Sequence, residues 1–214
     1  MKAILKEIID SPELPDYVRE LNQYLADENA KRLSFYENMR DDEKVEFING
    51  EIVCSSPAKD KHILTKLLLI YIFGQFLRKN KIGVIRDEKA LIKLRRNDFE
   101  PDICFFRKEI ADTFTRDKMF YPAPDFVVEI LSTSTARRDR GIKFVDYALN
   151  GVKEYWIVDP DKKIVEQYFL EGEVFALAEK IRHATVKCGE IKGLEIPLEA
   201  IFEEVANDDF LSKM

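Results

Sequence analysis

The stretch Phe126-Val-Val-Glu-Ile-Leu131 decides how the rest of the chain is interpreted, because it is apolar except for one carboxylate. A short, continuous apolar run of this kind is typical of a strand that is buried on both faces of a sheet. Burying an unpaired carboxylate costs several kcal/mol. Glu129 therefore requires a cation, a set of hydrogen bonds or a position at an edge.

Predicted helices and strands alternate on both sides of this strand. Before it, the spacing of apolar residues predicts a long amphipathic helix and three strands, over residues 60–78, 82–86, 90–94 and 103–106. After it we expect a short helix, a core strand, a hairpin and a terminal loop with a short helix, over residues 139–150, 155–158, 164–177 and 194–205. This order predicts a mixed α/β (α+β) fold whose central mixed sheet is flanked by helices.

The N-terminal part is predicted to be helical. Apolar residues recur at helical spacing over residues 15–38, where Pro15 suits a first turn, and residues 33–36 are expected to continue it as a helical hairpin. Asn49-Gly50 follows, flanked by alternating apolar residues, which is the strongest short signal for a β-hairpin, here over residues 45–53.

The composition is that of a globular protein. The chain has 214 residues, of which 46% are hydrophobic and 35% charged, enough for one domain with a sizeable core. We expect one domain over residues 41–214, with an N-terminal helical extension over residues 1–40. No run of apolar residues is long enough to predict a membrane span, and we expect a cytoplasmic protein without membrane contact.

Charge and cysteine usage narrow the kind of site. The net charge of −6 argues against broad, non-specific affinity for nucleic acid, but not against a local basic groove. Three widely spaced cysteines and two histidines argue against a zinc site. An activity on phosphates therefore requires a divalent cation, or clustered arginines and lysines, to offset the carboxylates.

A second carboxylate resembles Glu129 in its setting. Asp102 opens an apolar strand directly after Pro101, which fixes the entry of the chain. Two acids at neighbouring strand ends can converge on one Mg²⁺ or Mn²⁺ ion, since such ions prefer oxygen ligands and keep several waters. Taken singly, either acid can equally serve as a salt-bridge partner or a turn cap.

The segment after Glu129 combines hydroxyl and basic side chains. The loop Ser132-Thr-Ser-Thr135 is followed by the basic residues Arg137, Arg138, Arg140 and Lys143 around a predicted helix start. Hydroxyls, helix-start amides and guanidinium groups all favour phosphate oxygens. The alternative is a capped, solvated first turn, but basic residues at a helix N-terminus oppose the helix dipole. A bound anion or nearby carboxylates explain them better.

These residues form part of an ordered series of short motifs. The series is Glu46…Gly50-Glu51, Pro101-Asp102-Ile103, Val128-Glu129-Ile-Leu-Ser132-Thr-Ser-Thr135, Asp139…Lys143…Tyr147, Gly151-Val-Lys-Glu-Tyr-Trp156 and Val158-Asp-Pro160. In order and spacing it resembles the Uma2 family, which is placed in the PD-(D/E)XK restriction-endonuclease-like superfamily. The resemblance covers about residues 35–202 and implies a restriction-endonuclease-like core.

The resemblance also implies a role for three residues. Asp102 matches the motif aspartate and Glu129 the motif glutamate, both as ligands of a divalent metal. The usual pattern has a lysine two residues after the glutamate, and this chain has Leu131 there. The resemblance implies that the amine comes instead from the next helix, where Lys143 lies 14 residues after Glu129.

Two further positions match the family less specifically. Glu46 matches an acid ahead of the hairpin, and is either a further ligand or a surface acid at a strand edge. His62 opens the long predicted helix at a position that is often histidine in such proteins. It either orients a phosphate or a water, or makes a structural hydrogen bond.

Together these expectations describe a metal-dependent nuclease that hydrolyses phosphodiester bonds in DNA with Mg²⁺ or Mn²⁺. Ser132, Arg137, Arg138 and Arg140 would bind flanking phosphates. One alternative is an interaction module with the nuclease fold and weak or lost catalysis, which Leu131 and the net charge favour. Another is a metal-dependent hydrolase of small phosphate esters. A homodimer is also considered, with the hairpin over residues 164–177 as a pairing edge.

Overall fold

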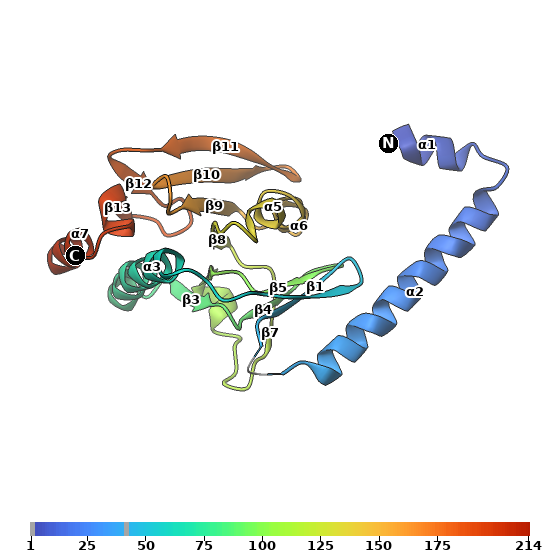
Figure 1. Cartoon of the computed structure of the whole chain (residues 1–214), viewed down its shortest axis with the longest axis horizontal. Coiled ribbons are helices and arrows are strands. Elements are labelled where there is room, and N and C mark those ends of the chain that lie inside the picture. Colours follow the sequence, from blue (N-terminus) through green and yellow to red (C-terminus); the bar gives the residue numbers. More distant parts are fainter. Residues whose placement is uncertain (1–2, 41–42) are drawn as a thin grey trace.

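The computed structural model describes residues 3–40 and 43–214, and its centre is a six-stranded sheet (Figure 1). The strands lie in the order β11-β10-β9-β8-β6-β3. Their bounds are Val174–Ile181, Ile164–Glu171, Glu154–Asp159, Phe126–Ile130, Ile103–Arg107 and Gly83–Asp87. β8 runs parallel to β9, and every other neighbouring pair is antiparallel. The prediction of a central mixed sheet is confirmed, and all five residues of β8 are buried.

A second, five-stranded sheet lies beside the first and was not predicted as a separate sheet. Its order is β2-β1-β5-β4-β7, with bounds Glu51–Cys54, Val45–Ile48, Asp98–Phe99, Leu91–Lys93 and Phe120–Tyr121. The predicted hairpin is confirmed: Asn49 and Gly50 both have positive φ, at 51° and 83°, as a two-residue turn of this kind requires. Strands of two or three residues, such as β5 and β7, are too short to produce a periodic signal.

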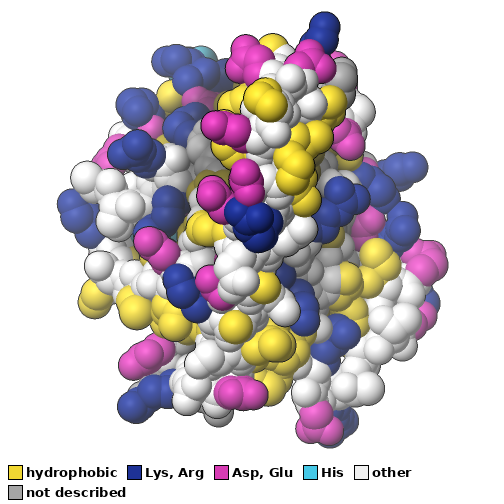
Figure 2. Space-filling view, turned by 90° about the vertical axis from the view of Figure 1, so that its right-hand side faces the viewer, with side chains coloured by type: hydrophobic (Ala, Val, Ile, Leu, Met, Phe, Trp, Pro, Cys, Tyr) yellow, Lys and Arg dark blue, Asp and Glu magenta, His cyan; other side chains and the backbone are white. Residues whose placement is uncertain are grey.

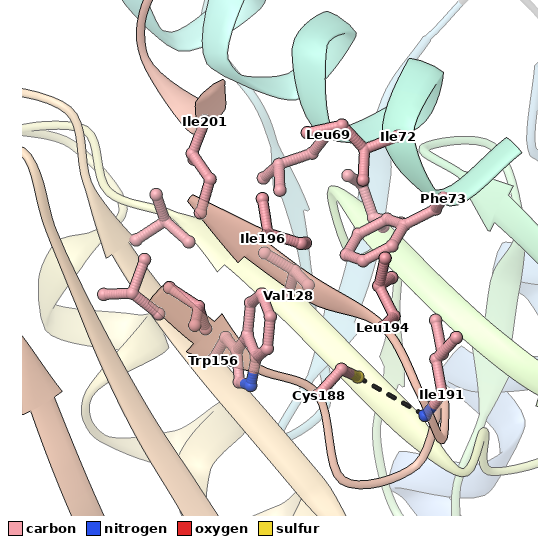
Figure 3. Packing of buried hydrophobic residues seen from close by; sticks show 14 of the residues in the cluster. Leu69, Ile72, Phe73, Val128, Trp156, Cys188, Ile191, Leu194, Ile196 and Ile201 are labelled. Atoms are coloured by element: carbon pink, nitrogen blue, oxygen red, sulfur yellow. Dashed lines mark hydrogen bonds between the residues drawn. The ribbon is translucent and has the colours of Figure 1, made fainter. Parts of the chain in front are cut away.

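The predicted long helix is α3 (Asp60–Asn80), which packs on one face of the six-stranded sheet. Figure 3 shows Leu69, Ile72 and Phe73 of this helix pointing toward Val128 and Trp156 of the sheet. The C-terminal segment closes the same core with β12, β13, η1 and α7, bounded by Thr185–Lys187, Glu195–Pro197, Leu198–Ile201 and Glu204–Lys213. This packing fixes the N-terminus of α3 relative to the ends of β6 and β8.

The helix predicted over residues 139–150 is divided in two. α5 (Ala136–Asp139) is a single turn and α6 (Ile142–Leu149) follows it. The division falls at Gly141, where a Cβ atom would come within 2.7 Å of the carbonyl oxygen of Arg137. The chain therefore turns at a position that only glycine fits, and Asp139 and Lys143 lie on either side of it. The remaining short helix is α4 (Lys108–Ala111).

The N-terminal part consists of α1 (Ala3–Ile9) and α2 (Leu14–Asn38). The predicted helical hairpin was wrong, because α2 is one continuous helix. It runs along the side of the body toward the N-terminus (Figure 1) and buries only Glu28, Arg32 and Phe35. Figure 2, which faces this side, shows hydrophobic and acidic side chains along the helices. The expected boundary at residue 41 falls on residues that lie outside the described ranges.

Among the helices that the structure describes, none has both the length and the apolar character needed to cross a bilayer.

Candidate active site

Asp102 and Glu129 are brought together by the pairing of β6 with β8. The two strands are antiparallel, with Ile103 opposite Val128, and continuing this register by one residue sets Asp102 opposite Glu129. Side chains at opposed positions lie on the same face of a sheet. The Asp102 carboxylate also accepts a hydrogen bond of 2.8 Å from the Ile130 backbone N–H. Strand pairing, which the sequence does not display directly, therefore builds the pair.

Asp102 is buried, and two basic side chains approach the same oxygen. Lys44 Nζ lies 3.2 Å from Asp102 Oδ1, and His62 Nε2 lies 3.4 Å from it. Burial alone would raise the pKa of this carboxyl, but the hydrogen bond from His62 and the charge of Lys44 outweigh burial and hold the pKa well below its usual range. Asp102 is thus ionised and ready to bind a cation. His62, at the start of α3, contacts the expected site.

Glu129 has a different electrostatic setting, although it lies opposite Asp102. Its Oε1 accepts hydrogen bonds from Lys143 Nζ at 3.0 Å and from the Tyr147 hydroxyl at 3.2 Å. Burial raises the pKa of Glu129 to about 8; the Lys143 charge opposes this rise, and the nearby carboxylates, led by Asp139, add to it. Glu129 therefore retains a proton near neutral pH unless another cation is present.

Glu46 is the third acid at the site and is not a surface residue. Only 2% of it is exposed, so the alternative of a surface acid at a strand edge does not hold. Its Oε1 lies 2.7 Å from Lys143 Nζ and accepts a hydrogen bond of 3.0 Å from the Glu100 backbone N–H. The sheet that contains β1 thus contributes a carboxylate to a site whose other carboxylates come from the six-stranded sheet and its helices.

Lys143 lies at the centre of these carboxylates. It is buried on α6, with Nζ 2.7 Å from Glu46, 3.0 Å from Glu129 and 3.8 Å from Asp139. Burial alone would lower the pKa of the ammonium, but the surrounding carboxylates, first Glu129 and then Glu46, raise it well above its ordinary value. Lys143 on the helix therefore contacts Glu129, as a lysine at position 131 would do in the usual pattern, where this chain has Leu131.

These side chains line one cavity of about 640 Å³. Ser132 also lines it, as do the neighbouring hydroxyls of residues 133–135 and, from the loop before α3, Ser55 and Ser56. Lys59, Lys61 and Lys66 contribute basic side chains to the lining. The cavity thus combines buried carboxylates with hydroxyl and ammonium groups, which suits a phosphate ester bound against a cation.

The three arginines expected to bind phosphates are not among the residues that line the cavity. Arg140 instead forms an ion pair with Glu166 on β10. Arg138 Nε is buried without a hydrogen-bond partner. Apart from Lys143, the cavity's lysines come from the segment before β1 and from the N-terminal part of α3, regions in which the sequence offered no phosphate-binding pattern.

Asp139 belongs to the motif series of the sequence analysis, but it was given no role in the site there. It is 1% exposed and lines the cavity, and its carboxylate oxygens make no hydrogen bond of normal geometry, with the Thr135 hydroxyl as a neighbour that lowers the pKa of the carboxyl. Burial raises the pKa of Asp139, opposed chiefly by the charge of Lys143. Lys44 was missed as well. The spacing of four residues between Asp139 and Lys143 was the available signal, since such residues are neighbours on a helix.

We refer to these ionisable groups as the cavity cluster: Glu46, Asp102, Glu129, Asp139, Lys44 and Lys143. If all were ionised, its four carboxylates would exceed its two ammonium groups by two charges, whereas over the whole lining of the cavity six carboxylates face five lysines. Within residues 3–40 and 43–214, no three His, Cys, Asp or Glu side chains form a ready-made cage for a metal ion. Mg²⁺ does not need one, because it binds through one or two carboxylates and keeps its waters. The donor set and the charge excess fit a divalent cation.

Comparison with known proteins agrees with the fold. A family model named Uma2, described as "Putative restriction endonuclease", matches residues 28–195. "Uncharacterized protein sll1609" from Synechocystis sp. (strain ATCC 27184 / PCC 6803 / Kazusa) is 31% identical over 137 residues, which cover 61% of this chain and 75% of that protein.

A solved structure, described as "a putative nuclease belonging to DUF820 from Anabaena variabilis ATCC 29413", superposes with a TM-score of 0.68. It is 18% identical in sequence, and the match covers 78% of this chain and 94% of that one. At this identity the likeness shows the fold, and it confirms the predicted fold class. The family match covers most of the predicted range of resemblance and begins earlier, within α2. The chain therefore belongs to the Uma2 family, whose model carries the description "Putative restriction endonuclease".

Proposed function

We propose that this protein is a metal-dependent nuclease that hydrolyses phosphodiester bonds in DNA. Asp102 and Glu129 would hold Mg²⁺ or Mn²⁺. The observation that carries the proposal is the opposed pair of buried carboxylates, with Lys143 bound to Glu129, in a cavity lined by hydroxyls and lysines. Pro101-Asp102 and Glu129 also match the PD-(D/E)XK pattern, with the departure at Leu131.

Each residue has a distinct task in this proposal. A bound cation would lower the pKa of a water and polarise the scissile phosphate. Lys143 supplies a fixed positive charge where negative charge develops on the phosphoryl oxygens. His62 contacts Oδ1 of Asp102 while the Ile130 N–H donates to Oδ2, so the two together fix the orientation of the carboxylate. Glu46 holds Lys143 in place and is a candidate further ligand.

We assign the binding of flanking phosphates to the cavity lining. Ser132 Oγ lies there and bonds to the Thr135 backbone N–H at 3.2 Å, which orders the hydroxyl loop. Lys59 and Lys66 offer positive charge on the α3 side. A basic lining of this size can act locally although the chain carries a net charge of −6. DNA as substrate, action in the cytoplasm and a homodimer belong to the proposal as well.

An interaction module without catalysis is the second candidate. It is favoured by Lys143, whose ammonium already bridges Glu46 and Glu129 and so pairs part of the charge without a metal. Calorimetric titration with Mn²⁺ separates the two, since an inactive scaffold would show no binding that depends on Asp102 and Glu129.

The test is cleavage of plasmid and single-stranded DNA with Mg²⁺ or Mn²⁺. We expect the wild type to cut, and we expect the cleavage rate of Asp102→Ala and of Glu129→Ala to fall at least about 100-fold. The fall should be this large because the loss of an outer-shell partner alone already costs about 10–100-fold. Glu195→Ala, which changes an exposed acid of β13, serves as the matched control and should cut like the wild type. Equal activity in all four proteins would reject the assignment. Activity on small phosphodiesters but not on DNA would reject the substrate.

A further inference from the structure

Asp139 lacks the hydrogen bonds that a buried carboxylate normally has. It is 1% exposed, and neither oxygen makes a hydrogen bond of normal geometry, although the Thr135 hydroxyl lies close enough to lower the pKa of the carboxyl. Nearly all buried polar atoms are hydrogen-bonded, so an exception of this kind calls for an explanation. The ion pair that Asp139 makes is with Lys143, at a distance of 3.8 Å, which is too long for a hydrogen bond. The carboxylate thus lies within ion-pair distance of the Lys143 ammonium but makes no hydrogen bond to it.

Lys143 is committed to other partners. An ammonium group has three N–H donors, and two of them are accounted for by Glu46 at 2.7 Å and Glu129 at 3.0 Å. In this arrangement the lysine occupies the place of a cation beside Glu129. A divalent cation that binds Glu129 would meet the positive charge of the ammonium at close range, and like charges so near each other repel strongly in a buried site.

We propose that Asp139 accepts the Lys143 ammonium when Glu129 binds a divalent cation, and so sets the cation affinity of the site through the lysine. The inference rests on the proposed metal site. The displacement that it requires is about 1 Å, from an ion pair to the usual length of a charged hydrogen bond. Asp139 and Lys143 flank the turn at Gly141, so the lysine side chain can change partner without any movement of the β8 strand.

A direct action of Asp139 on the cation predicts the same weaker binding in Asp139→Asn. Asp139 could attract the cation simply by its charge, and removing that charge would then weaken binding whatever Lys143 does. A double-mutant cycle separates the two, because a residue that acts through Lys143 loses its effect when the lysine is absent. Asp139 is a positioning residue in this account and not a ligand.

The experiment is calorimetric titration of the full chain with Mn²⁺, for the wild type, Asp139→Asn, Lys143→Gln and the double variant. We expect Asp139→Asn to weaken binding by about tenfold or more, as the loss of an outer-shell partner does. Lys143→Gln should bind more tightly than the wild type. In the Lys143→Gln background, Asp139→Asn should change the affinity by less than about twofold, because a residue that acts through Lys143 has no effect once the lysine is gone. Uncoupled residues would instead give the same loss in both backgrounds.

An equal loss in both backgrounds would overturn the inference, as would unchanged affinity in Asp139→Asn. Asp146→Asn is the matched control, because Asp146 is a buried carboxylate on α6 that does not line the cavity. This variant should leave the affinity unaltered. If Asp139→Asn does not fold, Lys143→Gln still decides, because weaker binding in that variant would contradict a competing ammonium. Absence of Mn²⁺ binding in the wild type and in Lys143→Gln alike would reject the metal site itself.

Discussion

Two buried clusters of charged side chains differ in how completely their charges are paired. The first, which we call the anchor cluster (Arg32, Tyr36 and Asp98), joins α2 to the five-stranded sheet. Arg32 donates from Nε to Asp98 at 2.7 Å and also to backbone carbonyls, and Tyr36 donates to Asp98 at 2.8 Å. Its one carboxylate meets one guanidinium, and the side-chain atoms of Arg32 and Asp98 do not appear among the unpartnered buried atoms of the described residues.

The cavity cluster is the opposite case. Carboxylates exceed ammonium groups, Glu129 has a raised pKa, and Asp139 and His62 have buried atoms without hydrogen-bond partners. A saturated cluster holds the fold, whereas an unsaturated one with excess charge is arranged for something that binds. The same removal of one negative charge should therefore destabilise the anchor cluster and stabilise the cavity cluster in the absence of metal.

The largest expected effect is at the anchor cluster. Asp98→Asn preserves shape but leaves the Arg32 charge buried without a counter-ion. Breaking a buried pair in this way costs roughly 3–5 kcal/mol. We expect the free energy of unfolding, measured by urea denaturation, to fall by that amount. A loss below about 1 kcal/mol, the level of exposed pairs, would show that water reaches Arg32 and that the cluster is not an anchor.

The cavity cluster should respond in the opposite direction. The pKa of Glu129 is raised to about 8 from an ordinary value of 4.5. Between these two pH values the folded state therefore retains a proton that the unfolded state has released. Stability should therefore fall as the pH rises from about 4.5 to about 8, with a slope of at most about 1.4 kcal/mol per pH unit.

Glu129→Gln removes this loss while Glu46 still pairs with Lys143. In EDTA at pH 8 we expect the free energy of unfolding of the variant to exceed that of the wild type, by at most roughly 4 kcal/mol, which is the loss that the wild type accumulates between pH 4.5 and pH 8. Urea denaturation from pH 5 to pH 9 measures both the gain and the slope. A variant that is less stable than the wild type at pH 8 would mean that the cavity cluster is a structural ion-pair network.

The smallest effect is expected at the edge of the α2 interface. Arg96 pairs with Glu28 at 2.7 Å, but 44% of the arginine side chain is exposed. Solvent screens such pairs, so Arg96→Gln should cost less than about 1 kcal/mol. Thermal unfolding beside Asp98→Asn gives the comparison. A cost equal to that of Asp98→Asn would mean that burial does not distinguish the two pairs.

The sequence predicted those features that depend on local pattern. The buried strand around Glu129, the Asn49-Gly50 hairpin and the long helix α3 all follow from spacing and turn chemistry, and the structure confirms them. The five-stranded sheet was not predicted, because β5 and β7 are too short to carry a pattern.

At the site, the sequence indicated individual residues but not their partners. Asp102 and Glu129 were found because one opens and the other interrupts an apolar strand, and because both match the family motif; strand pairing sets them opposite each other. Lys44 was not found and Asp139 was quoted without a role, because each lies in a charged segment where one more charge is unremarkable in sequence. Their burial is decided by tertiary packing, as is the pairing of Arg140 with Glu166.

A crystal structure of the protein soaked in Mn²⁺, with an anomalous difference map, tests the central proposal most directly. We predict an anomalous peak that contacts carboxylate oxygens of both Asp102 and Glu129, at about 2.0–2.2 Å as for hard cations of this size. Lys143 should then lie closer to Asp139 than the present 3.8 Å. A cavity without a peak, with Lys143 still bound to Glu129 and Glu46, would contradict the metal site and favour the inactive interaction module.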